Sequence, residues 1–407
     1  MLSRRRFFAS RLVPLIAPRH AIASVYAGLF FGIGVFMPFF PIWLEGRGFD
    51  AAMIALALAV PQTVRLLTMP LGGVLADRSG RPRATLIGYA LATALCFAGI
   101  AIAPNAAFIL IGLGLTAIFW QPSLPVLDAY AVARRREGIL DYGRVRLWGS
   151  MAFIGGNLVA GALLGGVVFG QVPRDAVIWL IVGASGAAAL AAATLEEVKA
   201  PPRQEEGPPG GGLAGLAPVL LVGMAAAALA QGAHAVLYAF ASIHWHARGL
   251  SDTVIGLLWS LGVIAEVVLF HFGTRVTRRL GAERLLLLGG ATGVLRFGAM
   301  AFDPPTALLL LLQPLHAVTF GCTYLGTVEL VARHAPPGRG ASVQAMAAWA
   351  TAIAMAGATL ASGPLWQAFG TRAFLASAAF GALGALLALV AGRMRDDGAV
   401  AGRTGAG

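Results

Sequence analysis

Among the ionisable side chains inside long apolar stretches of the sequence, seven are of a type and position that could do chemistry. They are Arg65, Asp128, Arg146, Glu266, Arg296, His316 and Glu329. A charge near the middle of a lipid bilayer costs about 2.5–3.5 kcal/mol on insertion scales, so such residues usually face the protein interior and have a partner. The proton affinity of a buried carboxylate changes when a neighbouring arginine moves. These residues are therefore candidates for binding an anionic substrate, a proton or both.

A purely structural role is the alternative for each of these residues. Opposite charges on neighbouring helices could pair to hold the helices in register, and Arg65 with Glu266 is the most obvious such pair. Arg144 opens the same apolar run as Arg146, but it is two residues closer to the preceding loop and can reach the membrane surface.

The composition indicates a protein that crosses a membrane many times. Of 407 residues, 58% are hydrophobic and only 12% are charged, and the mean hydropathy is +0.78. These values exceed those of ordinary soluble proteins. Apolar runs of about 20 residues, each long enough to cross a hydrocarbon core of about 30 Å as a helix, occur twelve times. The predicted spans are 20–44, 52–76, 83–103, 106–133, 143–169, 174–194, 216–245, 252–274, 283–301, 305–332, 341–367 and 372–393.

Basic residues are distributed unequally between alternate loops. The net charge is +12, and of the 30 lysines and arginines 22 fall in the two tails and one set of loops, four in the other set and four within the spans. This bias follows the positive-inside rule and predicts that both termini are cytoplasmic. The positive charge therefore suits a lipid bilayer, and we expect no nucleic-acid partner.

The sequence contains no recognisable motif of a cofactor, metal or catalytic site. Cys96 and Cys322 lie in different apolar runs and suggest neither a disulfide nor a cysteine-based metal site. His244 and His246 flank Trp245 without enough further ligands for zinc. A phosphate-binding loop, a G-x-S-x-G elbow and an H-E-x-x-H helix are also missing. We therefore expect no cofactor, no bound metal and no enzymatic activity.

A polar segment rich in proline and glycine, from Glu196 to Gly212, divides the chain into two sets of six predicted spans. Such a composition is typical of a linker. We predict a cytoplasmic tail at 1–19, an N-terminal bundle at 20–194, a linker at 195–215, a C-terminal bundle at 216–394 and a second cytoplasmic tail at 395–407.

The two halves of the chain resemble each other. R-G-F-D-A-A-M-I begins at Arg47 and R-G-L-S-D-T-V-I begins at Arg248, 201 residues later. The same offset places Arg65 on Glu266, Gly80 on Gly281 and Asp128 on Glu329. A parallel repeat with ionisable residues at matching positions is typical of secondary transporters built from two bundles.

The segment between the second and third predicted spans resembles the signature loop of the major facilitator superfamily. It reads G-G-V-L-A-D-R-S-G-R-P-R, and the matching residues are Gly73, Leu75, Asp77, Arg78, Gly80 and Arg81. In that family the loop latches the outward-open state, so the resemblance implies a cytoplasmic gating loop. It also implies the fold: an all-α polytopic membrane protein with twelve transmembrane helices in two pseudo-symmetric six-helix bundles.

The start of the fifth span resembles a narrower branch of that superfamily. Y-G-R-V-R-L-W-G-S, from Tyr142 to Ser150, is similar to the corresponding segment of the oligosaccharide, nucleoside and phenylpropionate proton symporters, which include the lactose permease. In that permease a carboxylate late in the fourth helix and the second arginine of this motif bind the sugar together. The resemblance implies this binding role for Asp128 and Arg146.

A second match to the same branch lies in the other half of the chain. Arg296 and His316 resemble the arginine and the histidine of the permease's proton-coupling group. Where that group has a glutamate, three residues after the histidine, this chain has Thr319. The proton site therefore cannot be carried across unchanged.

These resemblances imply a proton-coupled importer of a small organic solute that works by alternating access. The phenylpropionate-permease branch is the closest resemblance, and it implies a small aromatic acid as substrate and the bacterial inner membrane as location. We expect a monomer whose partners are the solute, protons and lipid. An efflux antiporter and a sugar or nucleoside symporter on the same fold are alternatives, and a polytopic membrane enzyme or a receptor is the alternative from another class. The lack of a proline between Gly149 and Val168 argues against a drug antiporter.

Overall fold

The computed structural model describes residues 17–170, 172–197 and 215–404, with the backbone alone at 69–79 and 395–404. The predicted N-terminal tail up to residue 16 and the predicted linker from 198 to 214 lie outside the described residues. All regular elements in the described part of the chain are helical.

Six helices form the first half of the chain. They are α1 (Pro18–Gly46), α2 (Ala51–Ser79), α3 (Pro82–Ala101), α4 (Ala106–Arg136), α5 (Tyr142–Leu164) and α6 (Ala176–Ala193). Short polar side chains begin several of them, because the first backbone N–H groups of a helix need acceptors. Asn105 Oδ1 accepts from the Phe108 N–H of α4 at 3.3 Å, and Asp141 Oδ1 accepts from the Arg144 N–H of α5 at 3.2 Å.

The second half also crosses six times, but two crossings are interrupted by irregular helix. The first joins α7 (Pro218–Gly232), the π-helix η1 (Leu237–Ala241) and α8 (Ser242–Ala247). The fourth joins α12 (Thr306–Leu312), the 3-10 turn η2 (Gln313–Leu315), the π-helix η3 (Ala317–Cys322) and α13 (Thr323–His334). The others are α9 (Asp252–His271) followed by the short α10 (Gly273–Leu280), α11 (Ala282–Met300), α14 (Gly340–Phe369) and, after the 3-10 turn η4 (Gly370–Ala373), α15 (Phe374–Thr404).

The number of crossings agrees with the sequence. Ten helical stretches are long and apolar enough to span a membrane, and one of them, Gly340–Met394, contains both α14 and α15. The remaining crossing is α11, which has 19 residues and carries three charges at Glu283, Arg284 and Arg296. The prediction of an all-helical membrane protein with twelve spans is therefore confirmed.

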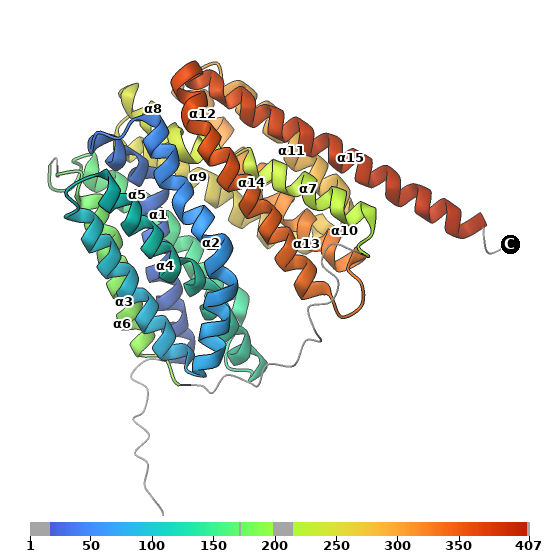
Figure 1. Ribbon diagram of the computed structural model, residues 1–407, viewed down its shortest axis with the longest axis horizontal. Helices are drawn as coiled ribbons and strands as arrows, with labels where there is room; N and C mark the ends of the chain where they lie inside the picture. The colour runs from blue at the N-terminus through green and yellow to red at the C-terminus, as the bar shows by residue number, and fades with distance from the viewer. Residues whose placement is uncertain (1–16, 171, 198–214, 405–407) are drawn as a thin grey trace, which may run out of the picture.

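The helices form two bundles, with α1 to α6 on one side and α7 to α15 on the other (Figure 1). In the first bundle α1 packs on α5 and α6; in the second α15 packs on α7 and α11. The bundles meet where α2 lies against α14 and α5 lies against α9. Small residues allow this close approach. A Cβ on Gly363 of α14 would lie 2.8 Å from the Ala51 carbonyl oxygen of α2, and one on Gly256 of α9 would lie 2.3 Å from the Asn157 carbonyl oxygen of α5.

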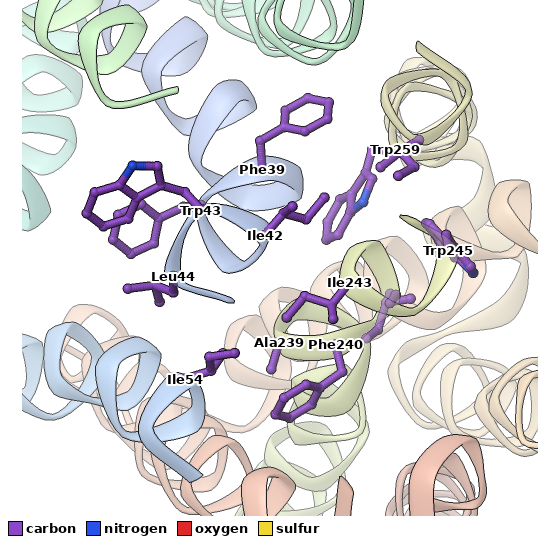
Figure 2. Close-up of a cluster of buried hydrophobic side chains, with 14 of the residues drawn as sticks. Phe39, Ile42, Trp43, Leu44, Ile54, Ala239, Phe240, Ile243, Trp245 and Trp259 are labelled. Carbon is purple, nitrogen blue, oxygen red and sulfur yellow. The ribbon is translucent and has the colours of Figure 1, made fainter. Parts of the chain in front are cut away.

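The two ends of the bundle pair differ. At the end where α1 finishes and α2 begins, one apolar core contains side chains of both bundles, including Phe39 and Trp43 with Phe240 and Trp259 (Figure 2). At the other end each bundle has its own separate core. We call the end with the shared core the closed end; its loops lie around residues 48, 104, 170, 249 and 303. We call the end with two separate cores the open end; its loops lie around residues 80, 139, 196 and 337. The bundles are thus sealed together at one end only.

The repeat is visible in the turns at the closed end. Gly48 and Gly249 both have positive φ, at 81° and 84°. The arginine before each glycine reaches the next loop of its own bundle: Arg47 Nη2 donates to the Ala103 carbonyl at 2.7 Å, and Arg248 Nη1 donates to the Pro304 carbonyl at 2.8 Å. Each member of these pairs lies 201 residues from its counterpart, so the offset found in the sequence also relates equivalent contacts.

Candidate substrate and proton site

Asp128 lies on α4 where α1 and α5 approach it. Its Oδ1 accepts a hydrogen bond from the Tyr26 hydroxyl of α1 and another, at 3.0 Å, from the Tyr142 hydroxyl of α5. Tyr26 is fully buried, whereas Asp128 is half-buried. The carboxylate therefore ties three helices of the N-terminal bundle together through one of its two oxygens.

Arg146, on α5, places its guanidinium over aromatic rings. Its Cζ lies 4.2 Å from the ring centroid of Phe30 and 5.5 Å from that of Tyr26. Contacts of this kind stabilise a cation through the negative face of the ring. Among the described residues no carboxylate lies within ion-pair distance of Arg146. The expected pair with Asp128 is therefore not a direct contact in this conformation, and the two groups are linked through Tyr26.

Arg144 differs from Arg146 in its surroundings. Its side chain is 89% exposed, and its Nε lies 3.7 Å from Oδ2 of Asp141, the residue that caps α5. An exposed pair of this kind contributes little to stability. The two arginines that open α5 thus have separate environments, one at the membrane surface and one between aromatic rings.

Glu266, His316 and Arg296 form a polar chain in the C-terminal bundle. Oε2 of Glu266, on α9, lies 3.4 Å from Nε2 of His316, and Nδ1 of His316 lies 3.4 Å from Nη1 of Arg296, on α11. Because a guanidinium can only donate, Nδ1 of His316 must accept, and the neutral ring then carries its proton on Nε2, facing Glu266. Glu266 pairs with His316 and not with Arg65, the partner that the sequence suggested, because η2 and η3 bring His316 against α9.

Arg296 is almost completely buried, with 1% of its surface exposed. Its Nη2 donates to Oε1 of Gln313 at 3.0 Å and its Nη1 donates to Oγ1 of Thr319 at 3.1 Å. Both acceptors are neutral, and Nε has no hydrogen-bond partner. Thr319, three residues after His316, thus contacts Arg296 but brings no negative charge to it.

His234 is a functional candidate that we did not predict from the sequence. It is completely buried, its Nδ1 lies 3.1 Å from the Gln231 carbonyl and its Nε2 lies 3.0 Å from Oγ1 of Thr319. The carbonyl can only accept, so the proton is on Nδ1 and the Thr319 hydroxyl donates to Nε2. A lone histidine in the middle of an apolar run was the available signal. The π-helices η1 and η3 begin shortly after His234 and His316, and such segments often occur at functional sites.

Two predicted site residues lie outside this cluster. Glu329 lies towards the open end of α13, where its Oε1 accepts from Nε of Arg333 at 2.5 Å, one helical turn later. Arg65 is half-buried on α2, eleven residues and therefore three turns after Ile54, which belongs to the core shared by the two bundles. Arg65 thus faces the bundle interface, closer to the open end than that core.

The predicted gating loop is only partly described. Gly73, Asp77 and Arg78 lie where the structure describes the backbone alone, so the side-chain contacts of Asp77 and Arg78 are not described. Gly80 has φ of 59°, a left-handed conformation that favours glycine, and Arg81 precedes the first residue of α3. Gly281, 201 residues after Gly80, also has positive φ. Both halves therefore have a left-handed glycine at this position.

The two parts of the site face each other across the bundle interface. Arg146 is carried by α5 and Glu266 by α9, and these helices pack together. Arg146 and Glu266 do not form an ion pair in this conformation, in which Glu266 pairs with His316. A cation against aromatic rings, opposite a chain of carboxylate, histidine and arginine, is suited to bind an organic anion beside a group that exchanges protons.

Two six-helix bundles with ionisable residues at their interface define a secondary membrane transporter of the major facilitator fold. The chain belongs to the MFS_1 like family, which it matches over residues 20–376. It is 32% identical over 357 residues to the probable 3-phenylpropionic acid transporter of Escherichia coli (strain K12), covering 87% of this chain and 92% of that protein. The predicted superfamily and the prediction of a transporter instead of an enzyme are therefore confirmed.

Solved structures show the same fold. The nucleoside transporter NupG is 16% identical with a TM-score of 0.77, covering 93% of this chain and 99% of that chain. The D-xylose-proton symporter is 16% identical with a TM-score of 0.70, covering 92% and 96%.

Proposed function

We propose that this chain is a proton-coupled importer of a small aromatic carboxylate. Arg146 carries the proposal: a half-buried guanidinium that lies against Phe30 and has no carboxylate partner in the described part of the chain. An aromatic acid offers a carboxylate to the guanidinium and a ring to the aromatic surface beside it. The compound named for the Escherichia coli relative, 3-phenylpropionic acid, has both groups.

In this proposal Glu266 carries the proton, with His316 and Arg296 behind it. Glu266 is the carboxylate that lies within ion-pair distance of His316, at 3.4 Å. Three residues after His316 the chain has Thr319, which cannot carry a proton in the way that a carboxylate does. In this proposal the positive charge of Arg146, carried by α5 against α9, opposes protonation of Glu266 as long as no substrate is bound. A substrate carboxylate on Arg146 neutralises that charge and thereby promotes protonation of Glu266. Substrate and proton then bind together, which is the requirement for symport.

Alternating access follows if residues 20–194 and 216–394 rock as two bodies about this site. We place the open end in the cytoplasm, because it holds the arginine-rich end of α4 and the basic α10, while Arg47, Arg174, Arg248 and Arg372 lie at the closed end. Both termini are then cytoplasmic, the membrane is the bacterial inner membrane, and the conformation described above is open to the cytoplasm. We propose that the monomer is the working unit.

Uptake of labelled 3-phenylpropionic acid into proteoliposomes, with and without an imposed proton gradient, tests the proposal. The wild-type protein should accumulate the acid only when the outside is more acidic. Arg146→Gln should lower uptake at least about tenfold, because a hydrogen-bonded charge pair contributes about 1.5–3 kcal/mol. Arg144→Gln is the matched control and should transport normally, since Arg144 is exposed.

Two results would contradict this function. Equal uptake with and without the gradient would exclude proton coupling, and equal loss in Arg146→Gln and Arg144→Gln would exclude Arg146 as the carboxylate site. Competition by sugars or nucleosides, and failure of aromatic acids to compete, would reassign the substrate to the other members of the branch. Loss of preloaded acid from vesicles under an opposing gradient, without uptake, would indicate an efflux antiporter.

A further inference from the structure

A charged cluster joins the two bundles at the closed end, away from the site described above. Arg174 lies in the turn before α6, in the N-terminal bundle, whereas His246 lies in α8 and Asp252 begins α9, both in the C-terminal bundle. Nη2 of Arg174 is 2.6 Å from Nε2 of His246, and its Nη1 is 3.9 Å from Oδ1 of Asp252. Nδ1 of His246 lies 3.5 Å from that same oxygen. The three residues are therefore all close to one another, although Arg174 belongs to the N-terminal bundle and His246 and Asp252 belong to the C-terminal bundle.

The cluster lies on a seam that has to part when the closed end opens. A Cβ on Gly161 of α5 would be 2.7 Å from the Asp252 carbonyl oxygen, and the Thr253 hydroxyl donates to the Gly161 carbonyl at 3.1 Å. The Asp252 side chain is only 7% exposed, while those of Arg174 and His246 are each 36% exposed. Protons from the surrounding water can therefore reach the histidine, whereas its carboxylate partner is held inside the seam.

The short contact between Arg174 and His246 determines the protonation state of the histidine. A guanidinium only donates hydrogen bonds, so Nε2 of His246 accepts one and carries no proton. The neutral ring then has its proton on Nδ1, the nitrogen that faces Asp252. A second proton can bind only at Nε2, where it would point at a guanidinium 2.6 Å away.

Other charged groups surround this contact. Glu45, in the last turn of α1 and thus on the N-terminal bundle, lies near both His246 and Arg174. A protonated His246 would thus have Glu45 and Asp252 as partners, with Arg174 as a like charge. Two further acids nearby are engaged elsewhere: Asp175 accepts from Nε1 of Trp43 at 2.8 Å, and Asp303 pairs with His244 at 2.7 Å and Arg248 at 2.8 Å.

We propose that His246 is a proton-binding site on the closed face that releases the contact between the bundles. A proton on Nε2 removes the acceptor for Arg174 and sets two cations of different bundles against each other, while Asp252 holds the imidazolium on its own bundle. Glu45, on the N-terminal bundle, carries the opposite charge to both cations and limits the separation. Histidine suits this role because its charge changes near neutral pH. The site goes beyond the proposed function, because it governs when this end opens and is independent of the substrate carried.

Spin-label distances across the closed end test the site without any transport. Labels at Ile102→Cys and Phe302→Cys, which are 78% and 77% exposed in corresponding loops of the two bundles, report separation of the bundles. Cys96 and Cys322 are replaced in the background, and the full-length protein is measured in nanodiscs without substrate. Lowering the pH from 8 to 5.5 should raise the population with the long distance about two- to fivefold, the effect of one half-exposed charge contact.

Three variants separate the possible outcomes. His246→Gln keeps an amide oxygen that can accept from Arg174 but cannot become charged, so it should remain closed at both pH values. His246→Lys should populate the long distance even at pH 8. His244→Gln, two residues away and paired with Asp303, is the matched control and should respond like the wild type. An unchanged pH response in His246→Gln, no response in the wild type, or loss of the response in His244→Gln would each overturn the proposal. Failure of aromatic-acid uptake would refute the proposed function and leave this result unaffected.

Discussion

The hydroxyl of Thr319 joins two buried groups that otherwise have few partners, so removing it should have a large effect. Thr319→Val keeps the shape of the side chain but removes the oxygen. Nη1 of Arg296 then keeps only its longer contact with Nδ1 of His316 at 3.4 Å, and Nε2 of His234 loses its donor at 3.0 Å. All three residues are at most 1% exposed, so water cannot replace the missing hydroxyl.

The magnitude follows from the kind of bond that is lost. Hydrogen bonds between membrane helices contribute about 0.6 kcal/mol on average and up to about 1.7 kcal/mol. A bond to a charged donor contributes more, about 1.5–3 kcal/mol, and a buried group left unpaired adds its desolvation cost. We therefore expect Thr319→Val to lower the free energy of unfolding by about 2–3 kcal/mol.

Unfolding in mixed micelles, followed by circular dichroism, measures the effect against a close control. Thr323, one turn later on α13, is also completely buried, but its hydroxyl donates only to the Thr319 backbone carbonyl at 2.7 Å. Thr323→Val should cost less than about 1 kcal/mol. In a double-mutant cycle, His234→Phe should cost less in the Thr319→Val background than in the wild type. If Thr319→Val and Thr323→Val unfold alike, or if the cycle is additive, the hydroxyl does not bridge His234 and Arg296.

Two further predictions concern transport. Glu266→Gln should abolish accumulation driven by a proton gradient but preserve exchange of labelled for unlabelled substrate. The reason is that glutamine can still accept from Nε2 of His316 but cannot release a proton. Equal loss of both activities would contradict this role. Gly256→Val should prevent α5 and α9 from closing, because its Cβ would lie 2.3 Å from the Asn157 carbonyl oxygen, and uptake should fall with it. Gly183→Val on α6, where a Cβ would meet nothing within 4 Å, is the control and should transport normally.

Most of the fold could be predicted from the sequence because the bilayer imposes a simple rule. Every backbone polar group in lipid has to be paired within the protein, so a long apolar run becomes a helix. The repeat could also be predicted, because equivalent turns need the same residue type. Gly48 and Gly249 match in the sequence, and both occupy turns with positive φ. The π-helical interruptions at η1 and η3 could not be predicted, because the apolar runs that contain them show no break in composition where the irregular helix begins.

The candidate site was predictable in its residue types but not in its pairings. A charge inside an apolar run indicates that it has a partner, but it does not identify that partner. Arg65 and Glu266 are related by the repeat, yet Glu266 pairs with His316, which the fold brings from a different crossing. Asp128 accepts from two tyrosines and reaches Arg146 only through one of them. Such contacts depend on how each helix is rotated, and this rotation is fixed by packing against helices distant in the sequence.

The repeat relates the backbones of the two halves but not their chemistry. Asp128 corresponds to Glu329, but the tyrosines that bind Asp128 have counterparts in Ala227 and Val343, and Arg333, which neutralises Glu329, has a counterpart in Val132. Arg296 and His316, which belong to the proposed proton site, correspond to Leu95 and Leu115, and Arg146 corresponds to Ala347. Each half therefore carries one part of the proposed site and lacks the other. In the proposed mechanism, the cation that binds the carboxylate and the chain that exchanges the proton lie on opposite bundles and influence each other only across the interface, so rocking would change both affinities at once. This division of the site between bundles is the physical basis on which we expect substrate and proton to be coupled.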